Sequence, residues 1–495
     1  MRKMNENTLT NLLSLSEVLL ATEGKLLNPT YSEEDFVFTS ITIDSRNCVE
    51  GSFFVPLVGN LDGHDFILSA AENGAKTVFV SDFYAKFHEK EIASFIDSGL
   101  CLISVSHTMY ALQKMAAYYV EKFPNLKKVA ITGSSGKTTT KEILVSLLQK
   151  KYKTVYNEGN LNSETGLPLS VFAIRDEHEW AVFEMGMNRR GEIRELAQVL
   201  KPNIAIITNI GSAHIGNLGT KDLIAEEKKS VFSFFETSSI AIIPVFDEYS
   251  EYLQTNTKGQ IVLYGNYEAL HIRAVKDRGL EGSVFLMEDQ EVSFPLYGSF
   301  NFLNALAALH CAKIAGLGIN EIKRGLEELR PSFGRAEIFN GEIAIVQDCY
   351  NANPESMNAS IEYFETLHWE GRKILILADM LELGFDSETQ HRLVGKKLKT
   401  LSFDMIFLLG SQMDWAYEEL LKGHDTDEDG DGKNEEKIYY NAFISDADFG
   451  NAVNDILVHV NKGDLLLLKG SRGMKLERIS EKLIKTFNMQ GCVLC

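Results

Sequence analysis

The stretch Val129-Ala-Ile-Thr-Gly-Ser-Ser-Gly-Lys-Thr-Thr-Thr140 decides the fold of this 495-residue chain. It reads as a short apolar strand, a glycine-rich turn, and a helix that opens at Lys137. This order is typical of a phosphate-binding loop, because glycines let backbone N–H groups turn toward phosphate oxygens and the helix N-terminus adds positive potential. The general pattern GxxxxGK[ST] is not met, since Ile131 stands at its first glycine. The motif here is the shorter GxxGKTT.

We expect this loop to bind ATP. Lys137 would reach the β- and γ-phosphates, and Thr138 would place its hydroxyl on Mg²⁺. The alternative is a glycine turn with an exposed lysine, which the order of strand, turn and helix disfavours. The other predicted nucleotide contacts in this stretch are Gly133, Ser134, Ser135, Gly136 and Thr139.

Two further apolar strands lead to polar residues. The strand Ala181–Glu184 ends in a carboxylate suited to Mg²⁺, and Ile204–Asn209 is followed by His214. Because the carboxyl ends of parallel strands meet at one edge of a sheet, we expect Glu184 and His214 to face ligand. Taken alone, such a glutamate is more often a charge at the start of a helix, and a lone histidine is usually structural or exposed.

The alternation of strands and helices predicts an α/β fold with mostly parallel sheets, in three domains. Residues 1–106 mix short strands and helices, 107–330 form the phosphate-loop domain, and 331–495 form a second α/β domain. No GxGxxG follows a strand of the last domain, so no dinucleotide site is predicted there. The other expected elements are a strand at Phe53–Leu57, helices at Phe66–Gly74 and Lys137–Gln149, and strands at Ile343–Val346, Ile374–Leu377, Met405–Leu409 and Leu465–Leu468.

Composition narrows the classes of function. Lys and Arg number 49 against 69 Asp and Glu, a net charge of −20. This charge disfavours general nucleic-acid binding and a basic membrane-binding face. No apolar run approaches the ~18 residues of a spanning helix, and residues 9–19 fit one face of a helix better than a signal peptide. We therefore expect a cytoplasmic protein without a membrane partner.

Two further local patterns match known motifs, but we favour a non-functional interpretation of each. Cys492-Val-Leu-Cys495 formally matches a prenylation box, which we take as chance. Asp425–Glu436 has the ligand spacing of a calcium loop, but Gly432 and Lys433 occupy unsuited positions. A solvated acidic insertion is the favoured interpretation of that segment.

Four separated motifs resemble those of the Mur ligase family, the ATP-dependent amino-acid ligases of peptidoglycan precursor synthesis. They are TGSSGKTT (132–139), FEMGM (183–187), TNIGSAH (208–214) and IAEEK (224–228). The resemblance runs from about Asp44 to Glu477 in the family's order. It implies an N-terminal mixed α/β domain for a UDP-sugar, a central mononucleotide-binding domain, and a C-terminal Rossmann-like domain for the incoming amine.

Three C-terminal motifs resemble one branch of the family. Tyr350–Pro354 reads YNANP and precedes Ser356-Met357, Ala378–Gly384 reads ADMLELG, and Leu468–Glu477 reads LKGSRGMKLE. This branch joins D-alanyl-D-alanine to UDP-N-acetylmuramoyl-tripeptide (UDP-MurNAc-tripeptide) through an acyl phosphate, and the family predicts a monomer. A sister ligase that adds one amino acid, a non-catalytic nucleotide-binding regulator and a phosphate-loop kinase remain alternatives. The motifs do not indicate whether the tripeptide ends in diaminopimelate or lysine.

The resemblance also implies the site residues. Lys228 aligns with a lysine that the family carbamylates into a metal ligand, although from the residues alone a neighbouring glutamate is the more natural ligand. Phe300, Gln347 and Ala378 depart from the family's pattern. The implied contacts are Thr138, Glu184, His214 and Lys228 for two Mg²⁺ ions, Ser45, Arg46, Asp62, Gly63 and His64 for the UDP-sugar, Asn160 and Asn162 for the substrate, Asn301, Asn304, Arg335 and Asp348 for ATP, and Asn351, Asn353, Asp379 and Glu382 for the dipeptide.

Overall fold

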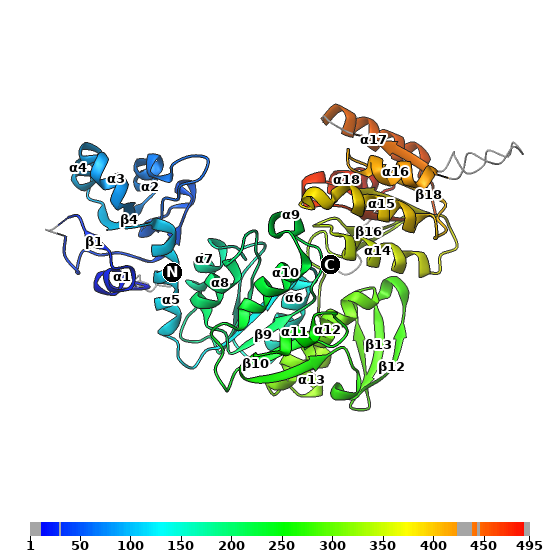
Figure 1. The fold of residues 1–495 in the computed structure, drawn as a ribbon, viewed down its shortest axis with the longest axis horizontal. Helices are drawn as coiled ribbons and strands as arrows, with labels where there is room; N and C mark the ends of the chain where they lie inside the picture. The colour runs from blue at the N-terminus through cyan, green and yellow to red at the C-terminus, as the bar shows by residue number, and fades with distance from the viewer. Residues whose placement is uncertain (1–10, 29–30, 423–437, 443–445, 490–495) are drawn as a thin grey trace, which may run out of the picture. The chain divides into compact units, whose positions relative to one another are not determined.

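The structure is a computed structural model that describes residues 11–28, 31–422, 438–442 and 446–489 (Figure 1). The acidic segment Asp425–Glu436 and the tail Cys492–Cys495 lie outside these residues. The chain divides into two compact units, and the domain boundaries predicted at 106/107 and 330/331 stay predictions. The first unit comprises residues up to Ala130, Lys153–Met187 and Gly191–Asn203; the second comprises Ile131–Tyr152, Asn188–Arg190 and the residues from Ile204 onward.

The N-terminal part of the first unit is built on a five-stranded sheet in the order β1-β5-β4-β3-β2, parallel except at the pair β1 and β5. The expected strand at Phe53 and the helix after Phe66 are confirmed. The strand ends at Phe54, two residues before Pro56, which has no N–H to donate to a ladder. The elements are α1 (Leu15–Thr22), β1 (Lys25–Leu26), β2 (Ser40–Thr42), β3 (Ser52–Phe54), α2 (Ile67–Glu72), β4 (Ala75–Ser81), α3 (Asp82–Phe87), α4 (Glu89–Asp97), β5 (Cys101–Val105) and α5 (Thr108–Glu121).

The remainder of the first unit carries the strand that was expected to end in Glu184. β8 (Trp180–Glu184) pairs in parallel with β7 (Thr154–Tyr156), and every residue of β8 is buried. A continuous apolar run of this kind is typical of a parallel strand covered on both faces. Two helices follow these strands in the chain, α7 (Gly166–Val171) and α8 (Glu192–Leu200).

The chain passes from the first unit into the second within β6 (Lys127–Thr132), directly before the glycine turn. In the second unit β9, β10 and β11 pair in parallel, and α12 and α13 pack against α6. The predicted strand and helix on either side of the turn are therefore confirmed. The elements are α6 (Lys137–Leu148), β9 (Ile204–Ile207), α9 (Ile215–Leu218), α10 (Lys221–Lys229), β10 (Ile240–Pro244), α11 (Ser250–Gln254), β11 (Gln260–Tyr264), α12 (Ser299–Ile314) and α13 (Ile319–Glu327).

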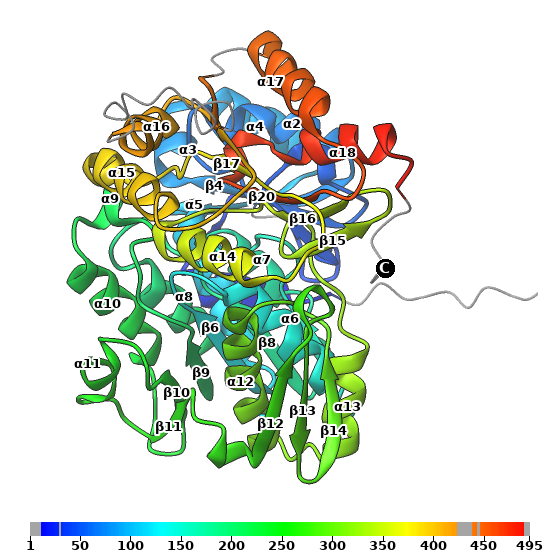
Figure 2. The same ribbon diagram turned by 90° about the vertical axis from the view of Figure 1, so that its right-hand side faces the viewer.

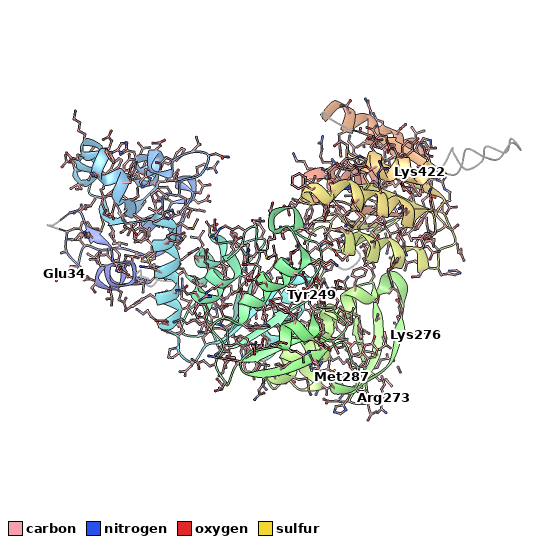
Figure 3. All side chains as sticks on the ribbon, in the orientation of Figure 1. Glu34, Tyr249, Arg273, Lys276, Met287 and Lys422 are labelled. Atoms are coloured by element: carbon pink, nitrogen blue, oxygen red, sulfur yellow. The ribbon has the colours of Figure 1, made fainter. Side chains whose placement is uncertain are left out.

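A three-stranded antiparallel sheet that the sequence analysis did not predict lies between β11 and α12 in the chain. It consists of β12 (Ile272–Asp277), β13 (Ser283–Met287) and β14 (Gln290–Phe294). The edge strand β12 carries exposed Arg273 and Lys276, which Figure 3 labels near the outer surface of the molecule. Charged side chains on an edge strand oppose pairing with another chain.

The C-terminal part of the second unit is a six-stranded sheet in the order β15-β16-β20-β17-β18-β19, parallel except at β15. Figure 2 shows α14, α15 and α16 on one side of this sheet and α17 and α18 on the other, and two separate apolar cores fill the faces. All four strands expected here are confirmed. The elements are β15 (Glu337–Asn340), β16 (Ala344–Asp348), α14 (Pro354–Thr366), β17 (Lys373–Ala378), α15 (Ser387–Leu398), β18 (Met405–Leu409), α16 (Met413–Leu421), β19 (Ile438–Asn441), α17 (Asp446–His459), β20 (Leu465–Lys469) and α18 (Glu477–Thr486).

A fully buried histidine, His391 of α15, holds the loop that follows β17. Its Nδ1 lies 2.7 Å from the carbonyl oxygen of Ser387 and therefore carries the proton, while Nε2 accepts from the backbone N–H of Met380 at 3.1 Å. Burial lowers the pKa of His391, and the hydrogen bond to Ser387 opposes that shift.

Within the described residues no helix is long and apolar enough to cross a membrane.

Acidification should therefore weaken the wild-type protein through His391. Below pH 6.5, roughly the pKa of a histidine in an unfolded chain, His391 binds a proton when the chain is unfolded. The buried ring of the folded protein stays neutral at that pH, so the free energy of unfolding falls as pH falls. Between pH 7.5 and 5.5 we therefore expect the free energy of unfolding to fall by more in the wild type than in His391→Gln. Urea titrations of both proteins at the two pH values measure this difference. Identical pH dependence in the two proteins would contradict the assignment.

Candidate functional site

The turn between β6 and α6 requires glycine at two positions. Gly133 and Gly136 have φ values of 150° and 77°. A Cβ on Gly133 would overlap the hydroxyl of Thr208, and one on Gly136 would overlap the carboxamide of Asn304. Gly136 is also the N-cap of α6 and supplies no side-chain cap, so the positive end of the helix is suited to an anion. The turn thus has the backbone that a phosphate loop needs.

A second loop, Thr208–His214, fixes this turn from behind. The backbone N–H of Ser134 donates to the carbonyl of Asn209 at 3.0 Å, and the N–H of Ser135 donates to the Asn209 side chain at 3.0 Å. The Ser134 hydroxyl accepts from Gly211 N at 2.8 Å and donates to Gly211 O at 3.1 Å. Ser134 is a predicted nucleotide contact, but its hydroxyl holds the two loops together.

Two predicted lysines converge on one carbonyl of the turn. Lys137 Nζ and Lys228 Nζ donate to the carbonyl oxygen of Gly133 at 2.9 and 2.8 Å, and Lys228 is only 1% exposed. Two buried or half-buried cations at one point favour a phosphate there. Among the described residues no cluster of three His, Cys, Asp or Glu side chains is placed to hold a metal ion. Lys228 as an ammonium group cannot ligate Mg²⁺, so its predicted role as a ligand depends on carbamylation.

His214 and Glu382, predicted for metal and dipeptide respectively, lie side by side. His214 Nδ1 is 3.1 Å from Glu382 Oε2, an ion-pair distance without hydrogen-bond alignment. The neighbouring His214 lowers the pKa of Glu382, and burial opposes the shift. Gly216 N also donates to the Glu382 carbonyl at 3.3 Å. The loop after β17 therefore contacts the loop that carries His214.

The two asparagines predicted for ATP have different surroundings. Asn301 is buried and donates to the Tyr297 carbonyl at 2.8 Å, a bond within the start of its own helix. Asn304 lies against Gly136 of the turn. Phe300, at the place of the family's histidine, packs edge-on against Tyr297 with ring centroids 5.9 Å apart. Asn304 is therefore the better placed of the two asparagines to contact a nucleotide.

The carboxyl ends of β16 and β20 carry a buried ion pair. Lys469 Nζ lies 2.8 Å from Asp348 Oδ2, and the Ser360 hydroxyl donates to the same oxygen at 2.8 Å. The Arg335 guanidinium stacks on the Tyr350 ring at 4.0 Å. Asp348 and Arg335 were predicted for ATP. Lys469 was not predicted, although it lies in the quoted KGSRGM motif.

The side chains predicted for the dipeptide have backbone partners. Asn353 is the N-cap of α14, and its Nδ2 lies 3.5 Å from the carbonyl of Ser134 in the glycine turn. Asn351 Oδ1 accepts from Ala352 N at 2.9 Å. Asp379 is 3% exposed, its Oδ1 accepts two backbone N–H groups at the start of α16, and burial raises its pKa to about 6 despite those bonds. Asp379 thus anchors a helix in this structure, and its predicted dipeptide contact stays a prediction.

Glu184, in the first unit, belongs to a network of asparagines. Asn162 Nδ2 donates to Glu184 Oε1 at 2.6 Å, and the predicted substrate contact of Asn162 stays a prediction. Asn157 makes two further bonds, from Nδ2 to the Glu184 carbonyl at 3.0 Å and from Glu184 N to its Oδ1 at 2.9 Å. The sequence analysis did not predict Asn157, although it directly follows β7. Asn160 is exposed.

Two of the residues predicted for the UDP-sugar, Asp62 and His64 in the first unit, hydrogen-bond to each other. The His64 ring donates from Nδ1 to Asp62 at 2.6 Å, accepts from Ser81 N at Nε2 at 3.0 Å, and stacks on Tyr84 at 4.3 Å. Both ring nitrogens are thereby used to fold the turn. Arg46 is exposed and donates hydrogen bonds to both carboxylate oxygens of Asp44. Ser45 is buried, and a Cβ on Gly63 would approach the backbone of Leu57 to 2.6 Å.

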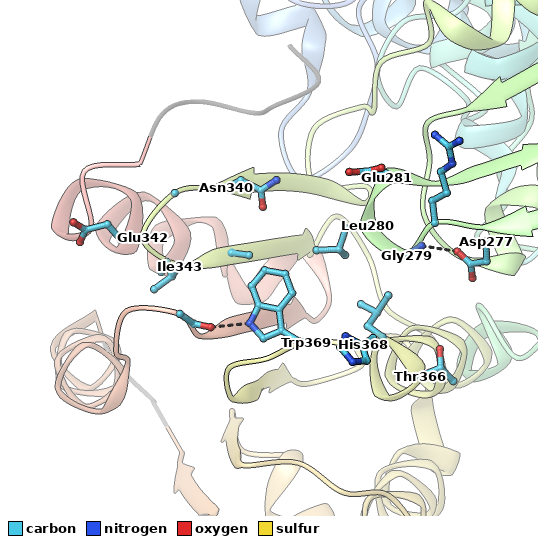
Figure 4. Close-up of a pocket in the computed structure, with 15 residues that line it drawn as sticks. Asp277, Gly279, Leu280, Glu281, Asn340, Glu342, Ile343, Thr366, His368 and Trp369 are labelled. Atoms are coloured by element: carbon cyan, nitrogen blue, oxygen red, sulfur yellow. Dashed lines mark hydrogen bonds between the residues drawn. The ribbon is translucent and has the colours of Figure 1, made fainter.

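One open cavity of about 810 Å³ in the second unit is separate from these residues (Figure 4). It is lined by the β12–β13 turn and by Asn340–Ala344, Thr366–Trp369 and Gly463. Ala344 and Gly463 lie at the amino ends of β16 and β20, whereas Asp348 and Lys469 lie at the carboxyl ends. Ligands of open α/β sheets bind at the carboxyl ends of the strands, so the cavity is not the predicted nucleotide site.

The fold and the turn define the class of protein: an α/β protein with a phosphate loop, followed in the chain by a second, mostly parallel sheet covered by helices. The Mur ligase middle domain matches residues 131–312, and the Mur ligase glutamate ligase domain matches residues 334–472. The chain is 37% identical to a UDP-N-acetylmuramoyl-tripeptide–D-alanyl-D-alanine ligase of Treponema pallidum (strain Nichols), over 96% of this chain and 99% of the relative. It is 33% identical to the Bacillus subtilis (strain 168) enzyme of that name, over 94% and 96%.

Solved structures are similar over the same extent. MurF from Acinetobacter baumannii superposes with a TM-score of 0.81 at 28% identity, covering 95% of this chain and 98% of that one. MurF ligase from Thermotoga maritima in complex with ADP gives a TM-score of 0.73 at 27% identity, covering 91% and 98%. The chain belongs to the Mur ligase family.

Gly136→Ala should weaken ADP binding at least about tenfold, because the new Cβ meets Asn304 and the left-handed backbone strains the turn. Gly191→Ala is the matched control. Gly191 is also a left-handed helix N-cap, with φ of 86° and no atom nearer its Cβ position than 3.9 Å. It should lower the melting temperature without changing ADP affinity. Titration calorimetry measures the affinities, and equal binding by both variants would contradict the site.

Proposed function

We propose that this chain joins D-alanyl-D-alanine to UDP-MurNAc-tripeptide with cleavage of ATP to ADP and phosphate. The observation that carries the proposal is the similarity, over nearly the full length, to ligases named for this reaction. The phosphate loop and the YNANP segment support it, because Asn353 of that segment lies 3.5 Å from the carbonyl of Ser134.

The chemistry explains why ATP is needed. A carboxylate and an amine do not condense in water, so the tripeptide carboxylate first attacks the γ-phosphorus of ATP, and the bond to ADP breaks. The product is an acyl phosphate. The neutral amine of the dipeptide then attacks the acyl carbon, phosphate leaves, and the amine proton passes to solvent or a nearby base. The first step brings two anions together and depends on cationic groups.

Several residues of the second unit are suited to that first step. The glycine turn and the start of α6 would bind the β- and γ-phosphates, with Lys137 neutralising charge. Arg335 would add a second cation from the C-terminal part. Mg²⁺, held by the Thr138 hydroxyl together with Glu184, His214 and a carbamylated Lys228, would supply further positive charge to the phosphates.

The second step requires the dipeptide to reach the acyl phosphate before water does. Asn351, Asn353 and Glu382 lie on loops of the C-terminal part that contact the turn or the His214 loop. We propose that these loops present the dipeptide amine, since alignment and exclusion of water both favour aminolysis over hydrolysis. The UDP-sugar contacts in the first unit, the monomeric state and the cytoplasmic location stay predictions.

Phosphate release tests the function. The purified protein, incubated with ATP, Mg²⁺ and UDP-MurNAc-tripeptide, should release phosphate only when D-alanyl-D-alanine is added. Release with a single amino acid instead would identify a sister ligase. Release with neither, while ADP still binds, would support a nucleotide-binding regulator. Tripeptides ending in diaminopimelate and in lysine, compared by kcat/KM, identify the third residue.

Carbamylation of Lys228 has a spectroscopic test. Protein equilibrated with ¹³C-labelled bicarbonate at pH 8 should show a carbamate carbon resonance that Lys228→Met lacks. The methionine variant keeps the length of the side chain but cannot bind carbon dioxide, and we expect it to lose at least about 100-fold in kcat. A wild-type protein without the resonance, and fully active without bicarbonate, would contradict the modification.

A further inference from the structure

The carboxylate of Glu355 makes a contact that its position in the helix does not require. Glu355 lies in the first turn of α14, whose N-terminus is already capped by reciprocal bonds between Asn353 and Ser356. Its side chain instead reaches the loop that carries His214. There Glu355 Oε1 accepts from the backbone N–H of Ser212 at 2.9 Å and from the Ser212 hydroxyl at 2.5 Å.

The loop is shaped to receive this carboxylate. A Cβ on Gly211 would lie 2.8–3.1 Å from three atoms of the Glu355 carboxylate, closer than side chains normally approach. The φ of Gly211 is not in the left-handed region, so the close approach, and not the backbone conformation, accounts for glycine here. The contact is thus formed by two specific residues from distant parts of the chain.

The same loop supports the phosphate turn. Gly211 exchanges two hydrogen bonds with the Ser134 hydroxyl, and three residues later the loop carries His214. A displacement of Ser212 would therefore move both the back of the turn and the His214 side chain. Displacements of about 1 Å in a catalytic site can lower the rate about 100-fold.

A purely stabilising ion pair is the simpler alternative. Lys221 Nζ lies 3.6 Å from Glu355 Oε1 but nearer Glu248, at 3.2 Å. The side chain of Glu355 is 37% exposed, and pairs of such exposure contribute little to stability. The two Ser212 bonds are shorter and fix one loop conformation. A stabilising pair would show in the melting temperature; a positioning contact would show in turnover.

We propose that Glu355 is a positioning residue for phosphoryl transfer: by accepting both hydrogen bonds of Ser212, it sets the Thr208–His214 loop behind the phosphate turn. It thereby couples the start of α14, beside the predicted dipeptide loop, to the nucleotide site. This inference rests on the proposed ligase function for its kinetic readout but not for its structural one.

Glu355→Ala should lower kcat about 10- to 100-fold while changing the KM for ATP less than about threefold. Glu355→Gln should keep kcat within about threefold of wild type, because the amide oxygen accepts the same two bonds. Equal losses in the two variants would show that the charge, and not the positioning contact, matters. Wild-type kcat in the alanine variant would also overturn the proposal.

A double-mutant cycle tests the contact itself. Gly211→Ala should lower kcat about tenfold in the wild type but less than about twofold in Glu355→Ala, where the clashing carboxylate is gone. Gly216→Ala is the matched control, since its Cβ would meet the backbone of Gly384 at 2.6 Å and not Glu355. Its effect should be the same in both backgrounds. Additive effects of Gly211→Ala and Glu355→Ala would contradict the proposed contact.

Hydrogen exchange separates this proposal from the ligase function. In Glu355→Ala the amides of the segment 208–214 should exchange at least about tenfold faster, and in Glu355→Gln at the wild-type rate. This readout needs no turnover, so a wild type without ligase activity would refute the function and leave the contact measurable. Unchanged exchange in Glu355→Ala would refute the positioning role even in an active ligase.

Discussion

The hydrogen bonds between the glycine turn and the Thr208–His214 loop are the constraint on which the nucleotide site depends. A phosphate loop needs contacts that secure its conformation on the side away from the ligand. Here the Ser134 hydroxyl and the Asn209 amide provide them. The absence of a Cβ at Gly133 lets Thr208 approach closely enough for its hydroxyl to donate to Ser135 O at 2.6 Å.

Two loops of the C-terminal part contact this region. The YNANP segment contacts the turn through Asn353, and Glu382 of the loop after β17 lies beside His214 of the Thr208–His214 loop. Both contacts are made by polar groups, which can exchange a protein partner for water or a ligand at little net cost. Such contacts suit a site that must open for substrates and close around an acyl phosphate.

Much of the fold was predictable because its decisive strands are buried parallel strands with continuous apolar runs, as in β8, β18 and β20. The antiparallel sheet β12–β14 was missed for a physical reason. β12 is exposed along nearly its whole length and interrupted by a bulge after Arg273, so it lacks both an apolar run and clean alternation. β19 was missed similarly, since none of its residues is fully buried. A strand that forms by pairing with its neighbours, without burying its side chains, has no recognisable hydrophobic pattern in its own sequence.

The site residues, like the strands, fall into those that a local motif predicts and those whose role depends on the tertiary fold. Motif position predicted Lys137, His214 and Asn353; in the structure Lys137 and Asn353 lie at the glycine turn, and His214 lies beside Glu382. It could not reveal that the buried Asp379 carboxylate anchors α16, or that His64 Nε2 accepts from Ser81, because these partners are backbone groups distant in sequence. Lys469 and Glu355 were not predicted, although each lies inside a recognised motif. Only the fold brings Lys469 to its partner Asp348 and Glu355 to its partner Ser212. In a protein of net charge −20, Lys137 and Lys228 both donate to the Gly133 carbonyl. As ammonium groups they place two positive charges beside the glycine turn, and carbamylation of Lys228 would leave Lys137 as the cation that attracts phosphate there.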